Sequence, residues 1–123
     1  DAAAPMPSTA TPVSQSTSTP TPAEPAQFGF LVKWGSRGDG DGHFERPSGI
    51  AVDGAGNVYV ADRDNHRVQV FDGESRFLAK WGTEGSGDSQ FIDPLGIAVD
   101  GAGNIYVADT DNNRVQVFAP VRP

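Results

Sequence analysis

The residues whose types could support chemistry are two histidines and two short charged motifs. His43 and His66 are the only histidines in the sequence, and a metal site built from both requires them on one face at ligand distance. Residues 39–42 read Asp-Gly-Asp-Gly and resemble the start of a calcium loop, but the ligand spacing and closing Glu of an EF-hand are absent. Residues 37–39 read Arg-Gly-Asp, an integrin-type tripeptide that matches easily by chance. We therefore expect no metal site and no cofactor.

Composition excludes several further classes of function. The chain has no cysteine, so disulfides, thiol nucleophiles and Cys-ligated zinc are excluded. Its net charge is −7, and no basic cluster is present, whereas a nucleic-acid binder normally carries a basic patch. No apolar run approaches the roughly 18 residues needed to span a bilayer. We expect neither nucleic-acid binding nor membrane insertion.

The elements that must position these residues come from an internal repeat. Residues 30–71 align with residues 77–118 at a constant offset of 47 without a gap, and about 30 of the 42 positions are identical. Each copy contains short runs rich in β-branched and aromatic residues, separated by Gly, Asn and Asp, and none is long enough for a helix. Four short strands in a unit of this length are typical of a propeller blade.

At these residues the resemblance to a known family becomes specific. Residues 47–71 read Pro-x-Gly-Ile-Ala-Val-Asp, then Asn-x-Tyr-Val-Ala-Asp-x-x-Asn-His-Arg-Val-Gln-Val-Phe, which resembles an NHL repeat. The family is named for an Asn-His-Leu trio, of which Asn65 and His66 match the first two members, with Arg67 in the third place. In the second copy Asn113 replaces the His. The fold class implied is all-β, with two four-stranded antiparallel β-propeller blades that form a partial propeller at 28–119, divided into 30–76 and 77–119.

The polar residues that recur in both copies have a structural interpretation. Asp62 stands where a strand ends, so its carboxylate can accept N–H bonds of the following turn, and Arg67 can pair with it across the hairpin. Trp34 and Trp81 are large enough to fill the space between blades, with an indole N–H that needs a partner. The structural signature comprises Asp62, Asn65, Arg67, Asp109, Asn112 and Arg114. We expect glycines 54, 56, 101 and 103 to take a positive φ in the hairpin turns.

The strand order implied by the family leaves both blades to be completed. Residues 48–53 would be the inner strand, followed by 57–62, 67–72 and the outer strand 76–82. Residues 28–34 then form an outer strand without a blade of its own, and the second copy lacks its outer strand. Because a ring needs about four to eight blades, we expect either further blades in a longer chain or head-to-tail self-association.

Differences between the copies mark positions that the blade scaffold does not dictate. Most fall in two loops that share one face in the propeller interpretation, the face where propellers usually bind. The alternative is that these are unconstrained surface loops. The candidate binding residues are Arg37, Asp39, Asp41, His43, Arg63 and His66 in the first copy, and Glu84, Asp88, Gln90, Thr110 and Asn113 in the second.

The expected function is a non-catalytic interaction or scaffold module that binds a protein, peptide or glycan through this loop face. The alternative is part of a metal-dependent propeller lyase or hydrolase, since some NHL-like propellers hold a metal over the central channel. No extra His or carboxylate is shared by both copies beyond the structural set, so we expect no catalytic residue.

Two terminal segments complete the domain organisation. Residues 1–27 hold six of the ten prolines among Ser, Thr and Ala, which is typical of a disordered linker or stalk. Residues 120–123 form a short tail. The Ser/Thr/Pro composition favours an extracellular or cell-envelope location, with a cytoplasmic linker as the alternative.

Overall fold

The computed structural model describes residues 26–120 of the 123. The disordered tail expected at 1–27 therefore lies almost wholly outside the described residues. A compact unit begins at Lys33, and residues 26–32, which precede it, contain no helix or strand. Within the described range, no helix has the length and apolar character needed to cross a membrane.

Two antiparallel sheets follow each other along the chain, and each is a simple meander. The first has the order β1-β2-β3-β4 and the second the order β5-β6-β7. A 3-10 turn, η2 or η3, joins the second and third strands of each sheet. The elements are β1 (Pro47–Val52), β2 (Val58–Asp62), η2 (Arg63–Asn65), β3 (Arg67–Phe71), β4 (Phe77–Trp81), β5 (Pro94–Val99), β6 (Ile105–Asp109), η3 (Thr110–Asn112) and β7 (Arg114–Phe118).

This architecture confirms the all-β fold and the two tandem blades of a β-propeller. The expected strands agree with the observed bounds to within one residue at each end. The second blade has three strands among the described residues, as the strand order implied. Residues 28–34 were expected to form an outer strand, but they form none, because no strand in the described part of the chain pairs with them.

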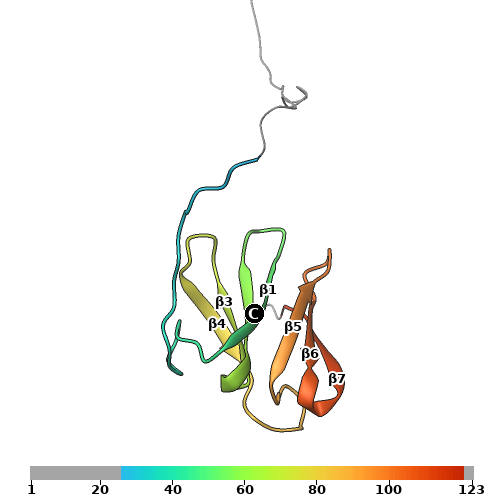
Figure 1. Ribbon diagram of the computed structural model, residues 1–123. Coiled ribbons are helices and arrows are strands. Elements are labelled where there is room, and N and C mark those ends of the chain that lie inside the picture. Colours follow the sequence, from blue (N-terminus) through green and yellow to red (C-terminus); the bar gives the residue numbers. More distant parts are fainter. Residues whose placement is uncertain (1–25, 121–123) are drawn as a thin grey trace, which may run out of the picture. The chain divides into compact units, whose positions relative to one another are not determined.

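The alternation of side chains along each strand builds the core between the blades. Figure 1 shows the two sheets next to each other, with β1 and β5 as the adjacent strands. Val68 of β3 packs with Phe91, Ile105 and Val107, and all four are buried. Val68 therefore faces the second blade, whereas Phe71 packs with Trp34 and Phe44 on the opposite face, because successive side chains of a strand point to alternate faces.

The two inner strands approach so closely that only a glycine fits between them. A Cβ placed on Gly49 would clash with the carbonyl oxygen of Leu95. Next to it, the hydroxyl of Ser48 donates to the carbonyl oxygens of Pro94 and Leu95, at 2.8 and 2.9 Å. Contact between blades is therefore made by backbone as well as by side chains.

Aromatic side chains fill the rest of the space around each blade. Trp81 lies with its ring centroid 5.2 Å from that of Phe118, and Trp34 lies 5.5 Å from Phe71 in the same relation. The expected packing between blades is therefore confirmed for Trp81, which lies against the core between the two sheets, whereas Trp34 packs on the first blade alone. The expected partner of the indole N–H is not found, because in the described part of the chain neither buried Nε1 atom donates a hydrogen bond.

The turns divide between the two ends of the blades. The β1–β2 and β3–β4 hairpin turns lie at one end, and η2, η3 and the loop before β5 lie at the other, which we call the loop end (Figure 1). The positive φ expected for the turn glycines is confirmed for Gly56 (88°) and Gly103 (87°) and is wrong for Gly54 and Gly101. In each turn the two central residues, 54–55 or 101–102, lie inside a turn closed by a hydrogen bond from the glycine N–H to the carbonyl of Asp53 or Asp100, and only that last glycine takes the left-handed conformation.

Candidate functional site

The loop end of the first blade is organised around one buried carboxylate, that of Asp62. Its Oδ1 atom accepts the backbone N–H of Glu45 at 2.8 Å. Its Oδ2 atom accepts hydrogen bonds from Asn65 (3.0 Å), Arg67 (2.7 Å) and Gln69 (3.1 Å). Because Asp62 is fully buried, these four donors replace the water that its charge would otherwise require.

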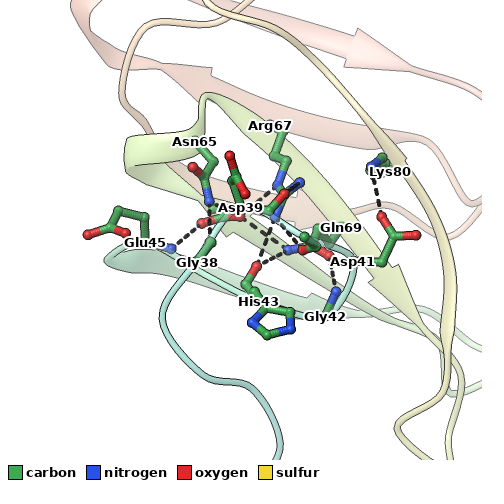
Figure 2. Close-up of polar contacts among 12 residues, drawn as sticks. Gly38, Asp39, Asp41, Gly42, His43, Glu45, Asn65, Arg67, Gln69 and Lys80 are labelled. Carbon is green, nitrogen blue, oxygen red and sulfur yellow. Dashed lines mark hydrogen bonds and ion pairs between the residues drawn. The ribbon is translucent and has the colours of Figure 1, made fainter.

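The same three side chains continue outward and hold the backbone of residues 38–43. Arg67 donates to the carbonyl oxygens of Asp39 (2.8 Å), Gly40 (2.9 Å) and His43 (2.8 Å). Figure 2 shows Asn65 reaching the carbonyl of Gly38, and Gln69 bridging Gly42 and His43. A loop that a sequence pattern describes only as Gly-rich is thereby tied to the sheet at five backbone groups.

The second blade repeats this arrangement atom for atom. Asp109 accepts hydrogen bonds from the backbone N–H of Ile92 and from Asn112, Arg114 and Gln116, at 2.8 to 3.2 Å. Burial tends to raise the pKa of Asp109, but these donors outweigh it and the pKa is lowered from its ordinary value. The residues of the structural signature therefore perform the same architectural task in both blades.

One detail of the predicted signature is wrong. The carboxylate of Asp62 was expected to accept backbone N–H groups of the turn that follows it, yet no backbone N–H of η2 donates to it, and only the Asn65 side chain does. Its backbone donor is Glu45, which precedes β1. The reason is direction, since the carboxylate points back across the sheet toward Arg67 and Gln69 rather than along the chain. The predicted Asp62–Arg67 pair itself is confirmed.

Three of the candidate binding residues line one groove at the loop end, between the two blades. Asp39, His66 and Glu84 lie around a space of about 550 Å³ together with Lys80 and Trp81. The Nδ1 atom of His66 accepts the backbone N–H of Asp93 at 3.1 Å, and its Nε2 atom lies 4.0 Å from a carboxylate oxygen of Glu84. The groove is therefore bordered by both loops that the sequence singled out.

Other candidates are engaged in contacts of their own. Arg37 pairs with Glu45 at 3.0 Å, and Asp41 pairs with Lys80 at 2.7 Å. The His43 ring shares a hydrogen bond of 3.0 Å with the hydroxyl of Ser36. Among the remaining candidates, the Gln90 side-chain oxygen accepts the backbone N–H of Gly87 at 2.9 Å, and Arg63 lies 3.9 Å from Asp64. Asp88 and Thr110 are exposed.

Backbone conformation explains one of the differences between the copies. His66 and Asn113 occupy equivalent positions and both adopt a left-handed conformation, with φ of 53° and 57°. Asn and His are among the residues enriched there. The exchange of one for the other thus conserves a local requirement, although His66 also reaches the groove, whereas no further blade lies beside Asn113 in the part of the chain that the structure describes.

The histidines do not form part of a larger ligand set. Among residues 26–120 no group of three or more His, Asp or Glu side chains is placed to hold a metal ion.

Two polar features escaped the sequence interpretation. Gln69 and Gln116 complete the carboxylate clusters. The sequence feature that could have revealed them is a Gln present in both copies, two residues after the Arg and on the same face of the strand. The second feature is the β1–β2 turn, where Asp53 accepts hydrogen bonds from Ala55, Asn57 and Tyr59. Its equivalent Asp100 has a pKa lowered to about 2, because the side chain and backbone of Asn104 donate to it.

Known proteins share these repeats. The family described as NHL repeat matches residues 44–71 and 91–118. The chain is 51% identical over 47 residues to the B-box type zinc finger protein ncl-1 of Caenorhabditis elegans, which covers 38% of this chain and 6% of that protein. It is 47% identical over 45 residues to the human NHL repeat-containing protein 3, covering 35% of this chain and 13% of that protein.

One solved structure adds a comparison of shape. Virginiamycin B lyase from Staphylococcus aureus superposes with a TM-score of 0.42 at 12% identity, over 63% of this chain and 28% of the lyase. The chain thus spans less than a third of each of these proteins. The matched residues cover β1–β3 of the first blade and β5–β7 of the second, and each match contains an Asp–Arg–Gln cluster around a buried Asp. This protein carries two NHL repeats, one in each of its two blades.

Proposed function

We propose that this chain is a non-catalytic interaction module that binds a protein segment at its loop end. The observation that carries the proposal is the double role of residues 38–43. Their backbone is held by Asn65, Arg67 and Gln69, while the Asp39 side chain remains exposed beside the groove. A loop held in one conformation before binding loses little entropy on binding, which favours affinity.

The charge of the groove points to the chemistry of the partner. Lys80 is already paired with Asp41, and Arg67 is turned inward to Asp62. The exposed charges that remain at the groove are the carboxylates of Asp39 and Glu84, and the side chain of Glu84 is 71% exposed. We therefore propose a basic protein segment as the ligand, since complementary charge favours both encounter and specificity.

A peptide selection against the immobilised chain tests this proposal. Selected peptides are expected to be rich in Lys and Arg. Their affinity, measured by calorimetry, is expected to fall about tenfold in the double variant Asp39→Asn/Glu84→Gln, the equivalent of about 1.4 kcal/mol. Neither carboxylate takes part in the buried cluster, so the variant keeps the fold.

The matched control is Glu74→Gln, which removes an exposed carboxylate from the β3–β4 turn at the opposite end of the blade. It is expected to leave the affinity unchanged. Selection of no peptide, of glycans in preference to peptides on a parallel array, or of peptides whose affinity ignores both loop-end substitutions would refute the proposal.

We also propose that these blades are joined by further blades of the same kind, through self-association or through more of the same polypeptide. The supporting observation is that, within residues 26–120, the second sheet has three strands where the first has four, which leaves the edge of β7 unpaired there. The Pro/Ser/Thr-rich segment supports an extracellular or cell-envelope location. Protease treatment of intact cells tests it, because protection of the chain from added protease would favour the cytoplasm instead.

A further inference from the structure

The rear of the second blade exposes side chains that the first blade buries. Val68 and Val115 are equivalent residues, as are Val70 and Val117. Val68 and Val70 are 0% and 7% exposed, while Val115 and Val117 are 64% and 54% exposed. The difference arises because the second blade covers Val68, and the described residues contain no third blade to cover Val115. We call Gly96, Tyr106, Val115 and Val117 the rear face.

The front of the first blade shows the opposite pattern. Phe91 and Pro94 of the second blade are buried against the first, but their equivalents Phe44 and Pro47 border open depressions of about 600 and 400 Å³. Ile50 in the same area is 62% exposed. We call Trp34, Phe44, Pro47 and Ile50 the front face. Front and rear faces are the two halves of the contact that already joins the blades within the chain.

The second sheet contains no fourth strand among the described residues, but the sequence holds a segment that matches such a strand. β4 pairs with β3 so that Ala79 lies opposite Val70 and Phe77 opposite Phe71. Residues 30–34 read Phe-Leu-Val-Lys-Trp and differ from β4 only by Val32 in place of Ala79. The same register would place Val32 opposite Val117 on the free edge of β7, where unpaired backbone groups are available for a further strand.

Charge supports the same pairing independently. Lys80 of β4 forms an ion pair of 2.7 Å with Asp41 in the loop before β1. The equivalents of these two residues are Lys33 and Asp88, both exposed. Lys33 lies in residues 30–34, the segment that matches β4, and Asp88 lies in the loop before β5 of the second blade. Both partners of this ion pair are therefore supplied when one copy meets another.

We propose that a second copy of this chain docks its front face on the rear face of the first, with residues 30–34 completing the second blade as its fourth strand. This inference rests on the proposed joining of further blades and commits to a second copy as their source. The copies then continue head to tail until the ring closes, at two to four copies for rings of about four to eight blades.

Gly96 offers a probe that leaves the single chain intact. Its equivalent Gly49 lies against the Leu95 carbonyl, where a Cβ would clash. In the single chain, a Cβ on Gly96 meets only the Ala108 Cβ, at 3.6 Å. In the proposed contact it would meet the carbonyl of Ser48 from the second copy, which is equivalent to Leu95. Alanine at this position therefore obstructs docking but not the fold.

The experiment measures the mass of the full chain by light scattering across a dilution series, with circular dichroism to follow folding. The wild-type chain is expected to form one closed species of two to four copies. Gly96→Ala and Val117→Lys are each expected to weaken assembly roughly 10- to 100-fold, because they overfill or charge a close-packed contact. Gly101→Ala is the control, since a Cβ there has no atom within 4 Å.

Each outcome of this experiment either supports or overturns the proposed docking between copies. A wild-type chain that is a folded monomer at all concentrations overturns the inference, as does an assembly whose mass ignores both Gly96→Ala and Val117→Lys. An assembly weakened by these two variants and not by Gly101→Ala supports it. Peptide affinity at the loop end is measured separately in the same samples, so loss of assembly with retained peptide binding leaves the proposed binding function standing.

Discussion

Val68 and Val115 occupy the same position in consecutive blades, yet Val68 is fully buried and Val115 is 64% exposed. The chain thus displays, on one molecule, both the covered and the uncovered form of the same surface. Burial in this fold is decided by the neighbouring blade rather than by the residue's own strand. Identical sequence in two blades therefore does not imply identical energetics.

This pair leads to a comparison of two truncations. Val68→Ala is expected to lower the free energy of unfolding by about 1.5–3 kcal/mol, because it removes methyl groups from a packed core. Val115→Ala is expected to leave the unfolding of the dilute chain within about 0.5 kcal/mol of wild type. At high concentration, assembly would also make Val115→Ala destabilising. Urea denaturation at two protein concentrations distinguishes the cases, and equal effects at both concentrations would contradict this prediction.

The buried Asp62 cluster predicts a larger loss of stability. Asp62→Ala leaves the guanidinium of Arg67, whose side chain is 8% exposed, buried without its counter-charge. We expect a loss of about 3–5 kcal/mol in the free energy of unfolding, as for other buried pairs broken on one side. Urea denaturation at fixed protein concentration measures it. The control Glu74→Ala removes an exposed carboxylate and should cost less than about 0.5 kcal/mol. Similar losses for the two variants would disprove the anchoring role.

Stability should fall in acid because of the hairpin turns. Hydrogen bonds from Asn104 hold the pKa of Asp100 at about 2, below the ordinary 3.8, and the pKa of Asp53 is lowered in the equivalent turn. Asp100 therefore stabilises the fold above about pH 4, and this contribution is lost as the pH falls toward about 2, while Asp53 contributes in the same direction. The urea midpoint should decline over this range. Asp100→Asn should flatten the decline, and an unchanged slope would show that other groups cause it.

A charge exchange examines the contact between copies without disturbing the core. Lys33→Glu and Asp88→Lys should each weaken assembly about two- to fivefold, since exposed ion pairs contribute about 0.2–1 kcal/mol. The two changes in one chain should restore it by re-forming the pair in reverse. Dissociation constants from analytical ultracentrifugation form the double-mutant cycle. Additive losses in the double variant would place Lys33 and Asp88 apart.

The sequence was sufficient to predict the fold because the same strand and turn pattern occurs in both copies of the repeat. An offset of 47 that preserves Pro47, Gly49 and Asp62 in both copies leaves few alternatives to tandem blades, and the strand bounds followed from β-branched runs between turn residues. The Asp62–Arg67 pair was also predictable, because five residues separate the ends of a tight hairpin. These are local relationships, visible within one blade.

What the sequence could not predict depends on contacts between distant segments. The Glu45 N–H that reaches Asp62 lies 17 residues away, and Arg67 bonds to loop carbonyls 24 to 28 residues away. Backbone groups carry no signature in a sequence, so the candidate loop was judged only by its variable side chains. Residues 28–34 have the composition of a strand, but a strand forms only next to a partner strand, and composition does not indicate whether that partner is present.

The most direct test of the account is a cross-link between Val32 and Val117, which the register of β4 places opposite each other in neighbouring copies. Because the chain has no cysteine, the double variant Val32→Cys/Val117→Cys contains only these two thiols. Oxidation should yield covalent rings or ladders of two to four copies on a denaturing gel, whereas the shifted pair Leu31→Cys/Val117→Cys should stay largely monomeric. Monomers from the first pair, or equal cross-linking of both pairs, would contradict the proposed strand pairing.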